Sequence, residues 1–219
     1  VTRIVTPGTV TDDALLDPQA CNYLSALTPV AAHQLGMAWV DVSTGRFCAA
    51  AFDEAQLADQ LARIKPAEIL ISDEVASLPD ELAGGAAITR RQAWTFGRTA
   101  AIESLTRHFG TKSLEGFGFD AERPADVLAM RAAGAVLNYL VETQKASLAH
   151  IDRLRASFCD ERLAVDSATR RSLELFATIR DGHRAAALIG VLDRTVTCLG
   201  ARMLADWMAA PLTDVAAIN

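Results

Sequence analysis

Three carboxylates, Asp41, Glu68 and Asp120, are the side chains that could hold catalytic metal ions. Two-metal nucleases need several such carboxylates, because the paired Mg²⁺ ions stabilise both the attacking and the leaving oxygen. Asp41 stands just before a Ser-Thr-Gly turn, where an aspartate usually accepts hydrogen bonds from nearby backbone amides. No second or third carboxylate lies at a spacing that would indicate a shared metal site, so we favour the role of Asp41 in the turn. A metal-dependent nuclease that uses Asp41 is kept as the alternative hypothesis.

The other chemistry-bearing residues form no recognisable motif. The cysteines and histidines are scattered and lack the spacing of a metal site. They are Cys21, Cys48, Cys159, Cys198, His33, His108, His150 and His183. No phosphate-binding glycine loop, dinucleotide-binding glycine pattern or nucleophile elbow occurs. The sequence therefore predicts no catalytic residue, no metal ligand and no cofactor on this chain.

Composition and charge narrow the class of protein. Of the 219 residues, 51% are hydrophobic and 22% are charged, which is typical of a globular protein. No apolar run approaches a membrane span and the N-terminus lacks a signal-peptide pattern, so we expect a cytoplasmic protein without membrane contact. Residues 1–150 carry 12 Lys/Arg and 18 Asp/Glu, whereas residues 151–219 carry nine of each. An acidic N-terminal part attracts DNA phosphates poorly, so we expect it to face another protein.

The elements that would position these residues begin with an α/β part. Short apolar runs predict strands at residues 2–6, 22–27, 37–42, 47–52, 68–72 and 86–89. The Gly-containing turn after residue 42 predicts an antiparallel meander. Helical spacing predicts helices at 54–64, 99–109 and 124–145, with Asp53 as the cap of the first. A strand that follows a helix, as at 68–72, favours parallel pairing.

The pattern becomes helical after an extended stretch at residues 163–165. Asp166 or Ser167 is expected to cap a helix that carries Leu173, Leu175 and Phe176. Residues 185–192 are apolar, and a last helix spans 199–207 before Pro211. We therefore predict two domains, an α/β domain at 1–155 and an all-α part at 156–219.

Ordered segments in both parts carry a resemblance to a known family. They are residues 6–9 (TPGT), 38–47 (AWVDVSTGRF), 66–70 (PAEIL), 114–118 (LEGFG), 166–175 (DSATRRSLEL), 190–197 (GVLDRTVT), 200–204 (GARML) and 211–214 (PLTD). This order resembles the MutS family of DNA mismatch-repair proteins, over the connector domain and the first part of the core or lever domain. Ser172 stands where the family usually has Asn, and Cys198 where it usually has Pro.

The resemblance implies a ribonuclease-H-like connector without its catalytic carboxylates at residues 1–155, followed by an incomplete all-α core domain at 156–219. Such a fragment would be no enzyme. It would transmit the conformational state between the DNA-binding and ATP-binding sites of a parent ATPase, and it would help to contact MutL. The parent would bind ATP and Mg²⁺, and would bind mismatched DNA as a homodimer, through parts that this chain lacks. Because the chain has no initiator Met, we expect both ends to be cut from that longer protein.

The resemblance also suggests where the partner binds. The helix at 99–109 corresponds to one that contacts MutL in the family, which makes Glu103, Ser104 and Arg107 the candidate partner-binding residues. Glu103 and Ser104 are not the family's typical polar amides. An incomplete core domain should leave apolar surface exposed around Leu199, Met203 and Trp207. Two alternatives stay open, a nuclease of ribonuclease-H-like fold that uses Asp41 and a stand-alone interaction module.

Overall fold

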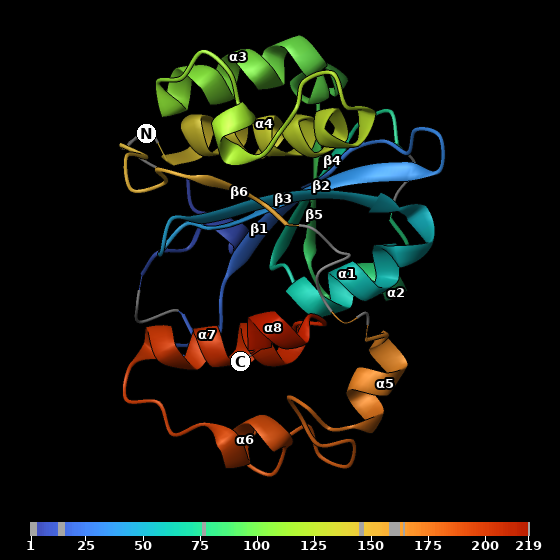
Figure 1. Cartoon of the computed structure of the whole chain (residues 1–219), viewed down its shortest axis with the longest axis vertical. Coiled ribbons are helices and arrows are strands. Elements are labelled where there is room, and N and C mark those ends of the chain that lie inside the picture. The colour runs from blue at the N-terminus through green and yellow to red at the C-terminus, as the bar shows by residue number, and fades with distance from the viewer. Residues whose placement is uncertain are drawn as a thin grey trace.

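The computed structural model describes residues 4–12, 16–75, 78–144, 147–157, 163 and 165–218. Figure 1 shows a sheet with helices on both faces and further helices beyond one face. The described strands are β1 (Tyr23–Leu27), β2 (Gln34–Asp41), β3 (Arg46–Asp53), β4 (Glu68–Ser72), β5 (Ala87–Arg91) and β6 (Leu154–Ala156). The described helices are α1 (Leu57–Ile64), α2 (Asp80–Ala83), α3 (Arg98–Phe109), α4 (Pro124–Gln144), α5 (Ser167–Ser172), α6 (Leu188–Leu192), α7 (Cys198–Ala209) and α8 (Val215–Ile218). Short 3₁₀ turns η1 (Pro7–Thr9), η2 (Glu54–Gln56), η3 (Ala93–Phe96) and η4 (Glu115–Phe117) join them.

The sheet is mixed, with its strands in the order β5-β4-β1-β2-β3-β6. The strands β1, β2 and β3 pair antiparallel, which confirms the predicted meander. The strand β4, which follows β3 and α1 in the chain, forms a parallel pair as predicted, but its partner is β1 and not β3; β5 pairs parallel with β4. Gly45 closes the β2–β3 turn at a φ of 74°, and a Cβ there would lie 2.2 Å from the carbonyl oxygen of His150. Only glycine fits both the angle and the close approach.

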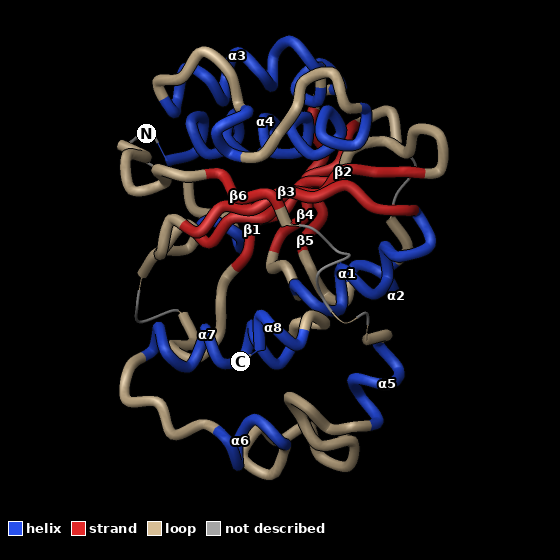
Figure 2. Tube along the Cα trace, viewed as in Figure 1, coloured by secondary structure: helices blue, strands red, loops and turns tan. Residues whose placement is uncertain are grey.

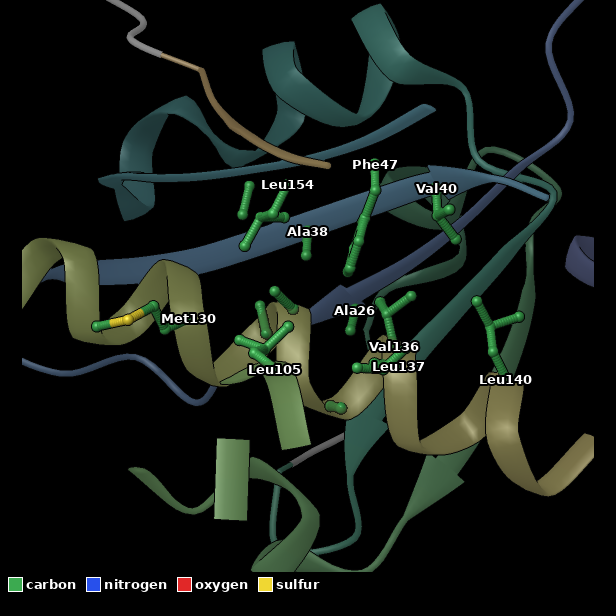
Figure 3. Close-up of a cluster of buried hydrophobic side chains, with 14 of the residues drawn as sticks. Ala26, Ala38, Val40, Phe47, Leu105, Met130, Val136, Leu137, Leu140 and Leu154 are labelled. Atoms are coloured by element: carbon green, nitrogen blue, oxygen red, sulfur yellow. The ribbon is translucent and has the colours of Figure 1, made fainter. Parts of the chain in front are cut away.

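The main core lies between the sheet and the long helix α4, and α3 packs on the outer side of α4 (Figures 1 and 3). Ala38 and Val40 of the sheet meet Val136 and Leu137 of α4 in this core. At Gly134 the two helices approach so closely that a Cβ would lie 2.5 Å from Ala101. A second cluster fills the space between the opposite sheet face and α1.

The structure corrects several predicted elements. Residues 4–6 of the strand expected at 2–6 are irregular, and residues 1–3 lie outside the described part. The helix α5 ends at Ser172, so Leu173, Leu175 and Phe176 follow it instead of lying on it. Glu174 has a φ of 46°, a left-handed conformation that cannot continue a right-handed helix. The elements α2, β6 and α8 were not predicted.

The C-terminal helices lie beyond the sheet face that α4 leaves free. Figure 2 shows α7 and α8 below the sheet, with α5 and α6 farther away. The predicted boundary between residues 155 and 156 falls inside β6, which pairs with β3, and it stays a prediction. None of the described helices is both long and apolar enough to cross a bilayer.

Candidate functional site at the junction of the sheet and the C-terminal helices

Complementary charges join α7 to the turn between β2 and β3. Asp41 and Arg46 are cross-strand partners at the ends of those strands, so their side chains lie side by side. Arg202 and Asp206 stand one helical turn apart on α7 and share a face. Arg46 forms an ion pair with Asp206, and Nη1 of Arg202 lies 3.6 Å from Oδ2 of Asp41. Each element therefore presents one positive and one negative charge to the other.

Asp41 combines the expected turn role with this junction. Its Oδ1 accepts hydrogen bonds from the backbone N of Ser43 (2.9 Å) and from the Ser43 hydroxyl (2.6 Å). The carboxylate is 1% exposed, and Oδ2 has no hydrogen bond among the described residues. Arg202 also donates to Ser43 Oγ (3.3 Å) and to the carbonyl oxygen of Pro18 (3.2 Å). The buried charge of Asp41 is thus balanced mainly by Arg202.

The apolar part of this junction is small. The buried residues of α7 are two alanines, Ala201 and Ala209. Leu199, Met203 and Trp207 of the same helix are 65%, 50% and 58% exposed, which confirms the apolar surface predicted there. Leu204, Ala205 and Met208 are half-buried, and no large side chain of α7 is fully buried, so the apolar area that holds this helix is limited. Interfaces of this polar kind between parts of one chain permit relative motion.

The helix α5 reaches the sheet domain through α1. The backbone N of Ser167, the first residue of α5, donates to Oδ1 of Asp59 (3.0 Å). Asp166 caps α5, its side chain accepting from the backbone N of Thr169, and this hydrogen bond lowers the pKa of Asp166. Lys65, which ends α1, lies 5.6 Å from the ring centre of Phe176. These contacts are also polar or cation–π in kind.

The three carboxylates considered for metal chemistry do not converge. Asp41 pairs with Tyr23 of β1, whereas Glu68 pairs with the next residue, Leu24. Neighbouring residues of a strand face opposite sides of a sheet, so Asp41 faces α7 and Glu68 faces α4. Oδ1 of Asp120 accepts from the backbone N of Glu122 in the loop before α4. No cluster of three or more His, Cys, Asp or Glu suited to a metal occurs in the described part of the chain. The structure gives the nuclease hypothesis no support.

Glu68 has a structural environment that the sequence pattern did not reveal. The side chain is fully buried. One carboxylate oxygen accepts from the Thr6 hydroxyl (2.5 Å) and the backbone N of Gly8 (3.0 Å). The other accepts from the hydroxyls of Thr89 (2.7 Å) and Tyr139 (2.8 Å). Four donors compensate the buried carboxylate, which ties η1, β5 and α4 to the start of β4.

The predicted partner-binding residues lie on the outermost helix of the sheet domain (Figure 1). Glu103 and Arg107 are exposed and one helical turn apart. Ser104 is half-buried and donates to Oδ1 of Asn138 on α4 (2.8 Å). The first two are accessible to a partner, whereas Ser104 also helps to fix α3 on α4.

The fold and the junction together define a two-part protein, a mixed-sheet domain joined through charged side chains to a helical segment. Two family models match it, MutS domain II over residues 22–152 and MutS domain III over residues 168–219. The DNA mismatch repair protein MutS of Rhodopirellula baltica is 44% identical over 238 residues, covering 100% of this chain and 26% of that protein. The protein of the same name from Myxococcus xanthus is 42% identical over 226 residues, covering 100% of this chain and 25% of that protein.

The chain belongs to the MutS family of DNA mismatch-repair proteins. It spans about a quarter of the length of these curated relatives. Domains II and III are the parts that the family models assign to it.

Proposed function

We propose that this chain is the non-catalytic connector of a MutS-type mismatch-repair protein, together with the first part of its helical core. The connector relays state between DNA-binding and ATP-binding parts that lie elsewhere in the parent protein. In this proposal the sheet domain is of ribonuclease-H-like type, and the helices α5 to α8 begin an all-α core. The antiparallel β1–β3 meander, continued by the parallel strands β4 and β5, supports the first assignment.

The observation that carries the relay role is the charged junction between α7 and the β2–β3 turn. A relay needs two parts that move relative to each other and a contact that favours one arrangement. Two buried alanines on α7 make separation inexpensive, while the buried charge of Asp41 favours the arrangement in which Arg202 lies beside it. The junction therefore has a preferred closed state that motion elsewhere can open.

We propose further roles for the parent protein. Its partners are MutL, a second copy of itself and mismatched DNA, the last bound outside this chain. ATP and Mg²⁺ act in the parent at a site that is not on this chain, and the protein works in the cytoplasm. The names of the curated relatives support the mismatch-repair role, and the acidic N-terminal part supports a protein partner in preference to DNA for the connector.

MutL is proposed to bind the outer face of α3 at Glu103, Ser104 and Arg107. The test is a calorimetric titration of the 219-residue chain with the ATPase domain of MutL from the same organism. The double variant Glu103→Ala with Arg107→Ala should bind more weakly. A matched double variant, Glu81→Ala with Arg153→Ala, removes one exposed charge of each sign elsewhere and should bind like the parent chain. Equal effects of the two double variants, or no saturable binding by the folded chain, would remove α3 from the proposal.

A further inference from the structure

A cavity of 390 Å³ lies between the end of α1 and the segment that begins with α5. Its charged lining residues are all cationic: Lys65, which follows α1, with Arg170 and Arg171 from α5. No acidic side chain lines it among the described residues. The whole chain has a net charge of −6, yet these three cations meet no acidic residue in the described lining, whereas the arginines around the cavity beside α7 share it with Asp152 and Asp206.

Arg170 carries a buried positive charge without a full set of partners. Its side chain is only 7% exposed. Nη2 donates to the carbonyl oxygens of Val165 (3.1 Å) and Ala209 (3.3 Å), whereas Nε and Nη1 make no hydrogen bond within the described part of the chain. Burial lowers the pKa of this guanidinium, and the negative charge of Asp59 opposes that effect. A buried cation with unfilled donors destabilises the fold unless an anion balances it.

Lys65 adds to this imbalance at the mouth of the cavity. It is exposed and ends α1 with a φ of 50°, and its ammonium lies over the ring of Phe176. Its pKa is lowered, first by burial of part of the side chain and then by the positive charge of Arg170. The two cations therefore repel each other across the cavity, and Arg171 contributes a third positive charge.

We propose that this cavity binds a phosphate group. Lys65 and Arg171, both exposed, would contact the phosphate oxygens directly at the mouth, while the buried charge of Arg170 attracts the anion from the wall. Lysine and arginine are the side chains that proteins use for phosphate, and an apolar surrounding strengthens such contacts. A volume of 390 Å³ falls within the size range of small-ligand sites.

The site would also connect the two parts of the chain. Lys65 belongs to the sheet domain, and Arg171 belongs to the first helix of the C-terminal part. A phosphate held by both neutralises the repulsion between them and fixes α5 beside α1. The ligand is either a free phosphate species or a nucleotide, whose base would meet the ring of Phe176.

The test is calorimetry on the 219-residue chain with pyrophosphate and with ADP, at constant ionic strength set by NaCl. We expect saturable binding of pyrophosphate at one site. The double variant Lys65→Gln with Arg171→Gln should weaken it at least about tenfold, the loss expected for two charge-assisted contacts. Tighter binding of ADP than of pyrophosphate would identify a nucleotide as the ligand, and equal affinities would identify phosphate alone.

The matched control is Arg153→Gln with Arg155→Gln. These two exposed arginines line a different cavity, beside α7, and their loss changes the net charge by the same amount. The control should retain the affinity of the unmodified 219-residue chain for pyrophosphate. Equal weakening in both double variants would show general attraction to a positive surface and would overturn the proposal. Failure of the folded, unmodified chain to bind pyrophosphate would overturn the proposed phosphate site as well, whatever the outcome of the titration with MutL.

Discussion

At the scale of single residues, the two buried carboxylates of the sheet, Asp41 and Glu68, have different partners and different roles. Glu68 and Asp41 are both almost completely buried, yet they face opposite sides of the sheet. Glu68 is compensated entirely by neutral donors, whereas Asp41 depends on the charge of Arg202. The first carboxylate therefore stabilises one domain, and the second links two parts of the chain.

Replacement of Glu68 by glutamine should destabilise the fold, because glutamine matches the four hydrogen-bond donors less well. In Glu68→Gln, one oxygen becomes an amide NH₂ that donates. Facing Thr6 and Gly8, it meets the backbone N–H of Gly8, which cannot accept; facing Thr89 and Tyr139, it requires both hydroxyls to turn and accept. The charge that strengthened all four hydrogen bonds is also lost. We expect the free energy of unfolding to fall by about 1–3 kcal/mol. Urea unfolding followed by circular dichroism measures it, with the exposed Glu81→Gln as the control. If the free energy of unfolding falls equally in the two variants, the hydrogen bonds to Glu68 contribute nothing measurable to the stability of the fold.

The sequence predicts part of the role of Asp41 but not the role of Glu68. The turn role of Asp41 was predicted because its partner, Ser43, is two positions away. Its contact with Arg202 could not be predicted, because Arg202 reaches the same turn from 159 positions further along the chain, at Ser43. The four donors to Glu68 come from three separate elements, η1 with its cap residue, β5 and α4, and no local pattern marks such a convergence.

At the scale of elements, length and context decided which predictions succeeded. The helix α4 is long, and an apolar face that repeats over several turns is a strong signal. The strand β6 has three residues, and it is a strand only because the edge of β3 is free to pair with it. The end of α5 escaped prediction because apolar residues continue at helical spacing past Ser172, while the backbone turns left-handed at Glu174.

Exchange of the charges at the junction tests how α7 docks on the β2–β3 turn. Arg46→Asp alone places a new carboxylate beside both Asp206 and Asp41 and should loosen α7, and Asp206→Arg alone places a new cation beside both Arg46 and Arg202. The double variant restores attraction between the turn and α7 but leaves like charges side by side on each element, so it should recover part of the loss. The coupling energy between the two positions, taken from a double-mutant cycle of unfolding free energies, is expected to be about 0.2–1 kcal/mol, because the side chain of Arg46 is 40% exposed and solvent screens the pair. Additive effects of the two changes would show that these side chains do not interact.

At the scale of the whole molecule, the chain is one well-packed domain with a weakly held helical extension. The contrast lies in what each part buries: α4 fully buries Leu137, Leu140 and other large side chains against the sheet, whereas α7 fully buries only two alanines and leaves its large side chains half-buried or exposed. The change in apolar spacing predicts the switch from strands to helices, and the described elements after β6 are all helices. How the parts meet was not predictable, because the junction consists of charged side chains, which a sequence pattern treats as surface.

This contrast predicts that the junction opens without unfolding the sheet domain. In Arg202→Gln, the buried charge of Asp41 loses its main partner, so the docked position of α7 becomes less favourable. Hydrogen exchange followed by mass spectrometry should then show faster exchange across α7 and unchanged exchange in β2 and α4. Arg194→Gln, an exposed arginine away from the junction, should leave both rates as they are. Faster exchange in α4 as well would mean that the junction supports the whole fold, and a single rigid body of that kind could not relay motion between its parts.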